Sequence, residues 1–295
     1  MEAIIMSITI TTNQNDIIQL KTLSFSGGER HVQLSNLPIN MPILISIKAI
    51  LNSTDDLLDL LLIDNALENH YGQQVKLHLE IPYLPYARQD RVCAEGQAFS
   101  LQLMAKLMKS LNTEEIVVWD CHSKVGLELT GATNVSATDI IKSDVQLSQL
   151  LHSSQTVLIC PDKGALQRCT ELKEELNIPN MVICEKKRDP KTGKITQTEV
   201  LTDDLTGKTA IITDDICDGG FTFIKIAEQL KAKNAEKIIL YVTHGIFSKG
   251  LNVFEGLIDE LYTTTSFTHQ PSDKLHIIDY TYNANNLITT NTKGA

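Results

Sequence analysis

The chain has 295 residues, 42% of them apolar and 21% charged, which suffices to bury the core of one large domain or two ordinary ones. A net charge of −10 excludes broad nucleic-acid binding through phosphate neutralisation, so phosphate chemistry would have to come from local sites. The six cysteines are scattered without a C-x-x-C pair, which favours buried, reduced thiols over disulfides or zinc. Because no signal-peptide pattern begins the chain and the most apolar run, 57–63, is too short to cross a bilayer, we expect a cytoplasmic protein.

Predicted strands and helices alternate along the chain. In chain order, we expect strands at 42–50, 75–83, 115–120, 156–162, 181–186, 210–215 and 237–245, with helices at 55–71, 100–111, 164–177 and 221–234. This alternation is typical of an α/β fold in which helices flank mainly parallel sheets. A polar stretch near 138–153 is expected to separate two halves, which divides the chain into domains 1–145 and 146–285 and a tail 286–295.

Unusual polar residues follow several predicted strands, where ligands bind in open α/β sheets. The most specific stretch is IITDDICDGGFT at 211–222. Gly219 and Gly220 would let backbone N–H groups approach a phosphate at a helix start, and the three aspartates suit Mg²⁺ or ribose hydroxyls. The alternative interpretation is a polar turn that caps the next helix.

Several stretches resemble one known family. The string at 214–222 resembles the ribose-phosphate loop of the phosphoribosyltransferase-like fold, and PYARQDR at 85–91 is similar to the signature of ribose-phosphate diphosphokinases (phosphoribosyl pyrophosphate synthetases). The family's order also includes FSGGE at 25–29, DCH at 120–122, PDKG at 161–164 and EKKR at 185–188. The longer run from residue 85 is similar to bacteriophage-type members. The resemblance, over roughly 20–245, implies two phosphoribosyltransferase-like domains, the first for ATP and the second for the ribose phosphate.

The resemblance also implies a role for each matched residue. The residues expected to bind ATP are Phe25, Glu29, Arg88, Gln89, Arg91 and His122. Those expected to bind the ribose phosphate are Asp214, Asp215, Asp218, Gly219, Gly220 and Thr222. The expected Mg²⁺ ligands are Asp120, His122 and Asp162, and the expected catalytic residues are Lys186, Arg188 and His122. For the segment around Lys186 and Arg188, a solvated charged hairpin is the alternative.

The implied reaction moves the β,γ-diphosphate of ATP to the anomeric hydroxyl of ribose 5-phosphate, giving phosphoribosyl pyrophosphate and AMP. Mg²⁺ is the implied cofactor, and a homodimer or hexamer is the implied assembly, with no nucleic-acid or membrane partner. Such chemistry depends on positioning and on charge neutralisation by Mg²⁺, Lys and Arg.

Two departures from the family pattern leave alternatives open. Gly27 stands where the base loop usually has Asp, so base selectivity rests on stacking by Phe25 and acceptance by Glu29. Phe221 interrupts the acceptor loop where a hydroxyl is usual, which makes ADP-ribose, and a place in NAD salvage, an alternative to ribose 5-phosphate. We expect Phe221 itself to lie in the core. A non-catalytic regulatory paralogue and a phosphoribosyltransferase are the remaining alternatives.

Overall fold

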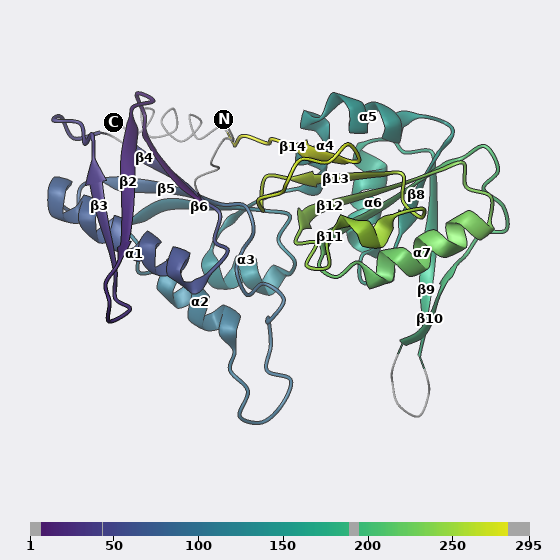
Figure 1. The fold of residues 1–295 in the computed structure, drawn as a ribbon, viewed down its shortest axis with the longest axis horizontal. Helices are drawn as coiled ribbons and strands as arrows, with labels where there is room; N and C mark the ends of the chain where they lie inside the picture. The colour runs from purple at the N-terminus through teal and green to yellow at the C-terminus, as the bar shows by residue number, and fades with distance from the viewer. Residues whose placement is uncertain (1–6, 43, 189–194, 283–295) are drawn as a thin grey trace. The chain divides into compact units, whose positions relative to one another are not determined.

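The computed structural model describes residues 7–42, 44–188 and 195–282, with the backbone alone for 186–188 and 195–198. The chain divides into two compact units, Met1–Val135 with Thr281–Ala295, and Ser136–Tyr280. Figure 1 shows that each unit is an α/β layer structure. The boundary expected between 145 and 146 falls within the second unit, and the domain limits 1–145, 146–285 and 286–295 stay a prediction.

The first unit is built on a seven-stranded sheet with the order β3-β2-β1-β4-β5-β6-β7. Its strands are β1 (Ile8–Thr12), β2 (Ile17–Ser24), β3 (Arg30–Ser35), β4 (Leu44–Ala49), β5 (Lys76–Ile81), β6 (Thr113–Trp119) and β7 (Thr133–Val135). β4 to β7 are parallel neighbours, and they confirm the strands predicted at 42–50, 75–83 and 115–120. The antiparallel strands β1 to β3 were not predicted. In β2 only Ile18 is buried, so this strand lacks the series of buried residues that marks β4, β5 and β6.

One face of this sheet forms the apolar core with two helices, α1 (Thr54–Tyr71) and α2 (Ser100–Met108). The side chains that share this core lie at alternate strand positions and on one stripe of each helix. They include Ile10, Ile47, Leu79, Leu60, Ile63, Leu101, Met104 and Met108. The shorter helix α3 (Lys124–Thr130) follows β6, and α2 packs against it. The packing holds the carboxyl ends of β4, β5 and β6 rigidly.

The opposite face of the same sheet carries charged side chains. Lys48 Nζ lies 3.7 Å from Glu80 Oε1, and His78 Nδ1 lies 3.2 Å from Glu115 Oε2. Tyr282 stacks on His78 with ring centroids 5.5 Å apart. Burial lowers the pKa of His78 from its ordinary value, although Glu115 acts in the opposite direction. Tyr282, which follows the second unit in the chain, thus packs on the sheet of the first unit.

The second unit contains a seven-stranded sheet with the order β10-β9-β8-β11-β12-β13-β14. Its strands are β8 (Thr156–Cys160), β9 (Asn180–Arg188), β10 (Ile195–Val200), β11 (Thr209–Cys217), β12 (Lys237–Gly245), β13 (Glu260–Thr264) and β14 (Leu275–Ile278). All neighbours are parallel except β9 and β10, which form an antiparallel hairpin at one edge. The structure therefore confirms the predicted α/β class with mainly parallel strands.

Helices lie on both faces of the second sheet. α7 (Phe221–Ala232) buries Phe223, Ile226 and Leu230 in the core on one face. α6 (Leu166–Glu175) lies on the other, where Cys169 Sγ is 3.5 Å from Thr213 Oγ1 of β11. The polar stretch 138–153 is itself mostly helical, as α4 (Ala137–Ser143) and α5 (Val145–His152). Within the described residues, no helix has the length and apolar character needed to cross a membrane.

Candidate active site

The first candidate site lies where three parallel strands of the first unit end. Since β4, β5 and β6 are parallel neighbours, the segments that follow them emerge at one edge of the sheet. A cavity of about 650 Å³ lies there. Its lining comes from the β4–α1 turn, the segment after β5 and one residue of α2, namely Leu51, Asn52, Ser53, Thr54, Leu57, Tyr83, Pro85, Tyr86, Arg88, Gln89 and Met104.

The segment after β5 places two predicted ATP-binding residues in this lining. Ala87 is buried, and Tyr86 has a left-handed backbone with φ of 62°. The amide of Gln89 donates a 2.8 Å hydrogen bond to the carbonyl of Tyr86. This turn leaves Arg88 and Gln89 exposed beside the cavity, where guanidinium and amide groups can bind phosphate oxygens.

Arg91 stands apart from these two residues. Its side chain is 80% exposed, and its Nε lies 3.5 Å from Asp90 Oδ1. Arg91 does not belong to the lining of the cavity. Arg88 thus lines the cavity of the first unit and Arg91 does not, and the ATP-binding roles of both stay predictions.

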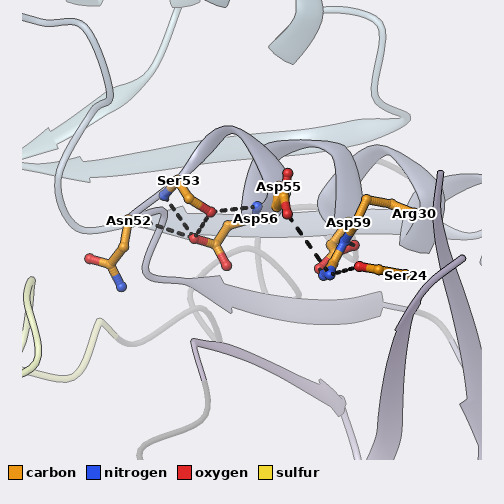
Figure 2. A network of polar contacts seen from close by, with 7 residues as sticks. All are labelled: Ser24, Arg30, Asn52, Ser53, Asp55, Asp56 and Asp59. Carbon is orange, nitrogen blue, oxygen red and sulfur yellow. Dashed lines mark hydrogen bonds and ion pairs between the residues drawn. The ribbon is translucent and has the colours of Figure 1, made fainter. Parts of the chain in front are cut away.

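The start of α1 contributes cavity residues that the sequence analysis did not single out. Ser53 caps the helix: its Oγ accepts from Asp56 N at 3.2 Å, and Asp56 Oδ2 accepts from Ser53 N at 2.8 Å (Figure 2). The amide of Asn52 donates to the same carboxylate at 3.0 Å. Asp56 therefore already occupies the positive end of this helix. The sequence feature that could have identified residues 52–54 was their position shortly after the predicted strand that ends at residue 50.

The predicted base loop, 25–29, is the turn between β2 and β3. Phe25 N donates to Glu29 O at 2.9 Å, and the Phe25 side chain is 58% exposed. Arg30 anchors the turn to α1: its Nε donates to Asp59 Oδ1 at 3.0 Å, and its NH1 donates to Ser24 Oγ at 2.9 Å (Figure 2). The Glu29 carboxylate lies over Gly27, 2.6 Å from where a Cβ would stand. The loop thus presents an aromatic ring and one carboxylate on a fixed base.

The DCH motif follows β6 in a constrained turn. Asp120 is only 7% exposed and has a left-handed φ of 39°. Its amide donates to Val135 O at 2.7 Å, and the amide of Cys121 donates to Asn134 Oδ1 at 2.9 Å. β7 therefore holds Asp120 in a conformation that few non-glycine residues adopt, while His122 stays exposed. A strained turn of this kind is typical of a functional position.

The second candidate site lies where β8 and β11 end in the second unit. Asp162 follows β8, and its Oδ1 accepts from the amides of Gly164 and Ala165 at 2.8 and 3.1 Å. Asp214 and Asp215 are partly buried near the end of β11. Arg168 of α6 donates from NH2 to the main-chain carbonyl of Asp214 at 2.7 Å. Loss of solvation, with the neighbouring Asp215 charge, raises the pKa of Asp214 well above its ordinary value, against the effect of Arg168.

The acceptor loop, which we define as 217–222, leads from β11 into α7. Gly220 has φ of 79°, and a Cβ there would lie 2.7 Å from Phe254 Cζ, so only glycine fits. Asp218 is exposed, and its Oδ1 accepts a 2.6 Å hydrogen bond from Ser248 Oγ. Thr222 stands in the first turn of α7. The loop combines a carboxylate, close backbone approach and a helix N-terminus, which suits a phosphorylated sugar.

The expectation for Phe221 was wrong. Its side chain is 71% exposed at the first position of α7, not buried in the core. The helix buries Phe223 and Ile226 instead, and residue 221 points away from that stripe. The acceptor loop therefore carries an exposed aromatic ring.

The two remaining catalytic candidates are described only in part. Lys186 and Arg188 belong to β9, where the backbone register pairs them with Thr198 and Ile195 of β10. Their side chains lie outside the described residues. The backbone has the hairpin form that the sequence allowed as an alternative, and the catalytic role stays a prediction.

Within the described part of the chain, no three side chains among His, Cys, Asp and Glu gather as a metal site. Asp120 and His122 belong to the first unit, and Asp162 belongs to the second. This is compatible with Mg²⁺, which usually binds through one or two protein ligands together with substrate phosphates.

Comparisons with known proteins agree with this architecture. Residues 4–111 match the family model described as the N-terminal domain of ribose phosphate pyrophosphokinase, and residues 136–253 match the phosphoribosyl transferase domain. A ribose-phosphate pyrophosphokinase from Pyrococcus furiosus is 30% identical over 267 residues, covering 89% of this chain and 90% of the relative. A second, from Pasteurella multocida, is 26% identical and covers 85% of this chain and 79% of the relative.

Among solved structures, phosphoribosylpyrophosphate synthetase from Mycobacterium smegmatis aligns with a TM-score of 0.74 at 19% identity, covering 95% of this chain and 91% of that one. The fold and its strand-end loops thus define an α/β protein made of two phosphoribosyltransferase-type domains. Given the identity and coverage of the Pyrococcus relative, the chain belongs to the ribose-phosphate pyrophosphokinase family.

Proposed function

We propose that this chain transfers the β,γ-diphosphate of ATP to the anomeric hydroxyl of ribose 5-phosphate, producing phosphoribosyl pyrophosphate and AMP. The observation that carries the proposal is the acceptor loop. In this loop Gly220, with its left-handed backbone, is the N-cap of α7, and Asp214, Asp215 and Asp218 precede it. Aspartates can accept hydrogen bonds from ribose hydroxyls, and the helix start favours the 5′-phosphate. The family relationship supports the same activity.

In this mechanism the anomeric oxygen attacks the β-phosphorus of ATP and gives up its proton to solvent. The bond between the β-phosphorus and the oxygen that joins it to the α-phosphorus breaks, and AMP leaves with that oxygen. Arg88 and Gln89 would hold the ATP phosphates, with Arg91 and His122 as further contacts. Phe25 and Glu29 would hold the adenine, and Lys186 and Arg188 would neutralise the transferring group. The protein's contribution is alignment and charge stabilisation rather than covalent catalysis.

Asp120 and His122 are the residues of the first unit that would hold Mg²⁺, and Asp162 of the second unit is a candidate ligand for a second ion. The nearly buried Asp120 carboxylate beside the exposed His122 offers an oxygen and a nitrogen ligand, which fits a cation completed by phosphate oxygens. When bound, Mg²⁺ supplies positive charge to the phosphate oxygens. Removing Mg²⁺ with a chelator should abolish turnover, and turnover that persists would refute this assignment.

The proposal is tested by incubating the protein with Mg²⁺–ATP and ribose 5-phosphate, then measuring AMP release and product mass. We expect one AMP for each phosphoribosyl pyrophosphate formed. No AMP from any acceptor would instead support the non-catalytic paralogue, and sugar activation without ATP would support a phosphoribosyltransferase.

ADP-ribose is a second candidate acceptor, favoured by the exposure of Phe221. Phe221 is 71% exposed within the acceptor loop, where its ring can stack on a base carried by a larger 5′ substituent. The same assay with ADP-ribose distinguishes the two candidates. AMP release with ADP-ribose alone would place the protein in NAD metabolism, whereas release with ribose 5-phosphate alone would exclude this role for Phe221.

Three finer assignments accompany the proposal. The run from 85 to 100 supports a bacteriophage-type member, which comparison with phage-encoded relatives tests. The exposed base loop supports a homodimer or hexamer, which light scattering of the purified protein tests. We also infer a cytoplasmic enzyme, which fractionation of the host cell tests.

A further inference from the structure

The loop at 246–250 is fixed directly onto the acceptor loop. The amides of Ile246 and Phe247 both donate to the carbonyl of Cys217, at 2.8 and 3.1 Å. The amide of Ser248 donates to Asp218 O at 3.1 Å, and its hydroxyl donates to Asp218 Oδ1 at 2.6 Å. Four hydrogen bonds therefore hold these two strand-end loops in one register.

The next residue in this loop, Lys249, lies along the glycines of the acceptor loop. Its Cγ is 3.6 Å from the position that a Cβ on Gly219 would occupy. The turn is shaped by left-handed backbone at Phe247 and Gly250, with φ of 46° and 73°, and the Gly250 amide donates to Phe247 O at 2.8 Å. Lys249 is exposed, so its ammonium group is accessible to a ligand at the loop.

The negative charge of the acceptor aspartates explains why a cation at this position would affect phosphate binding. The segment 214–222 contains three aspartates and no Lys or Arg. The guanidinium of Arg168, which lies in α6, donates to the main-chain carbonyl of Asp214 near the end of β11. A phosphate dianion that binds among carboxylates needs a nearby positive charge to offset their repulsion. Lys249 is a cation held against the acceptor loop from outside that segment.

We propose that Lys249 binds the 5′-phosphate of the acceptor sugar and is a specificity-determining residue of this site, an inference that rests on the proposed function. No sequence motif points to Lys249, because it lies about thirty residues beyond the acceptor motif. The fixed loop brings the aliphatic part of the Lys249 side chain to Gly219, where the backbone would approach the phosphate.

The test compares Lys249→Gln and Lys249→Arg with Lys274→Gln, a matched loss of charge just before the edge strand β14, at the amino ends of the parallel strands. We expect Lys249→Gln to raise KM for ribose 5-phosphate about tenfold, in line with loss of one charge-assisted hydrogen bond, with kcat and KM for ATP nearly unchanged. Lys249→Arg should restore most of the affinity, and Lys274→Gln should match the parent protein.

A second measurement keeps binding separate from turnover. Calorimetric titration with ribose 5-phosphate should show the same tenfold weakening in Lys249→Gln, while unphosphorylated ribose should bind both proteins equally. Unchanged affinity for ribose 5-phosphate in Lys249→Gln would overturn the inference. If the parent protein released no AMP yet bound ribose 5-phosphate through Lys249, the proposed reaction would fail and the phosphate contact would stand.

Discussion

Arg168 in α6 donates a 2.7 Å hydrogen bond to the main-chain carbonyl of Asp214 in β11. The bond ties a helix that follows β8 to the end of the neighbouring strand, where the acceptor aspartates stand. It also brings a positive charge beside Asp214, where it partly offsets the effect of lost solvation on that carboxyl. Arg168 is therefore a positioning residue for the acceptor site.

Replacing Arg168 with Met should destabilise the second unit by about 1.5–3 kcal/mol, because a hydrogen bond from a charged donor is lost at a partly buried carbonyl. We expect kcat/KM for ribose 5-phosphate to fall about tenfold. Urea unfolding and steady-state kinetics check both effects, with Arg168→Lys as the control that keeps the charge. Unaltered kinetics in a destabilised Arg168→Met protein would limit Arg168 to a structural role.

Asp214 should make the protein less stable as pH rises. Its folded-state pKa is raised by lost solvation and by Asp215, so the folded state holds its proton at a pH where the unfolded state has released it. The unfolding free energy therefore decreases with pH between the ordinary and the raised pKa. Asp214→Asn should melt at a higher temperature than the parent at neutral pH, and this difference in melting temperature should disappear at about pH 4.

Melting curves across this pH range, recorded without Mg²⁺ or substrates, check the prediction. The same variant should lose most of its activity, since an amide replaces a carboxylate expected to accept from the ribose. A melting temperature difference that stays constant with pH would contradict the raised pKa.

Arg88 and Arg91 should differ in their effect on ATP. Arg88 lines the cavity of the first unit, whereas Arg91 is 80% exposed and close to Asp90. Loss of a charge-assisted phosphate contact costs about 1.5–3 kcal/mol, so Arg88→Ala should raise KM for ATP about 10- to 100-fold. Arg91→Ala should have a much smaller effect. Equal losses in the two variants would mean that Arg91 reaches the phosphates as well.

Gly220 should tolerate no side chain. Alanine there must adopt φ of 79° and would also place its Cβ 2.7 Å from Phe254. Left-handed strain and overpacking together predict a loss of about 2–5 kcal/mol and an inactive acceptor loop. Gly256→Ala is the matched control, because Gly256 has φ of 69° with no atom within 4 Å of the added methyl, so only about 1–2 kcal/mol should be lost. Chemical denaturation of both variants decides whether the Phe254 contact matters.

Local patterns in the sequence were enough to predict most of the longer elements, namely β4, β5, β6, β8, β9, β11, β12, α1, α2, α6 and α7. The shorter parallel strands β7, β13 and β14 and the helices α3, α4 and α5 were not predicted. Buried strands such as β8 and β12 are short runs rich in β-branched and large apolar residues, followed by polar residues or glycine. The antiparallel strands β2 and β3 were not predicted because their side chains are largely exposed, so no buried run distinguishes them from a loop. β1 does alternate buried and exposed side chains, but it has only five residues.

The sequence by itself identified the chemical groups at the strand ends, because PYARQDR, DCH and DDICDGGFT are contiguous motifs that can be recognised without knowing what packs around them. Only the tertiary structure decided which residues face each site. It places Ser53 beside Arg88, turns Phe221 outward and brings Lys249 to Gly219. These relationships join segments that are distant in the chain, and they arise from sheet register and helix packing, which no local pattern encodes.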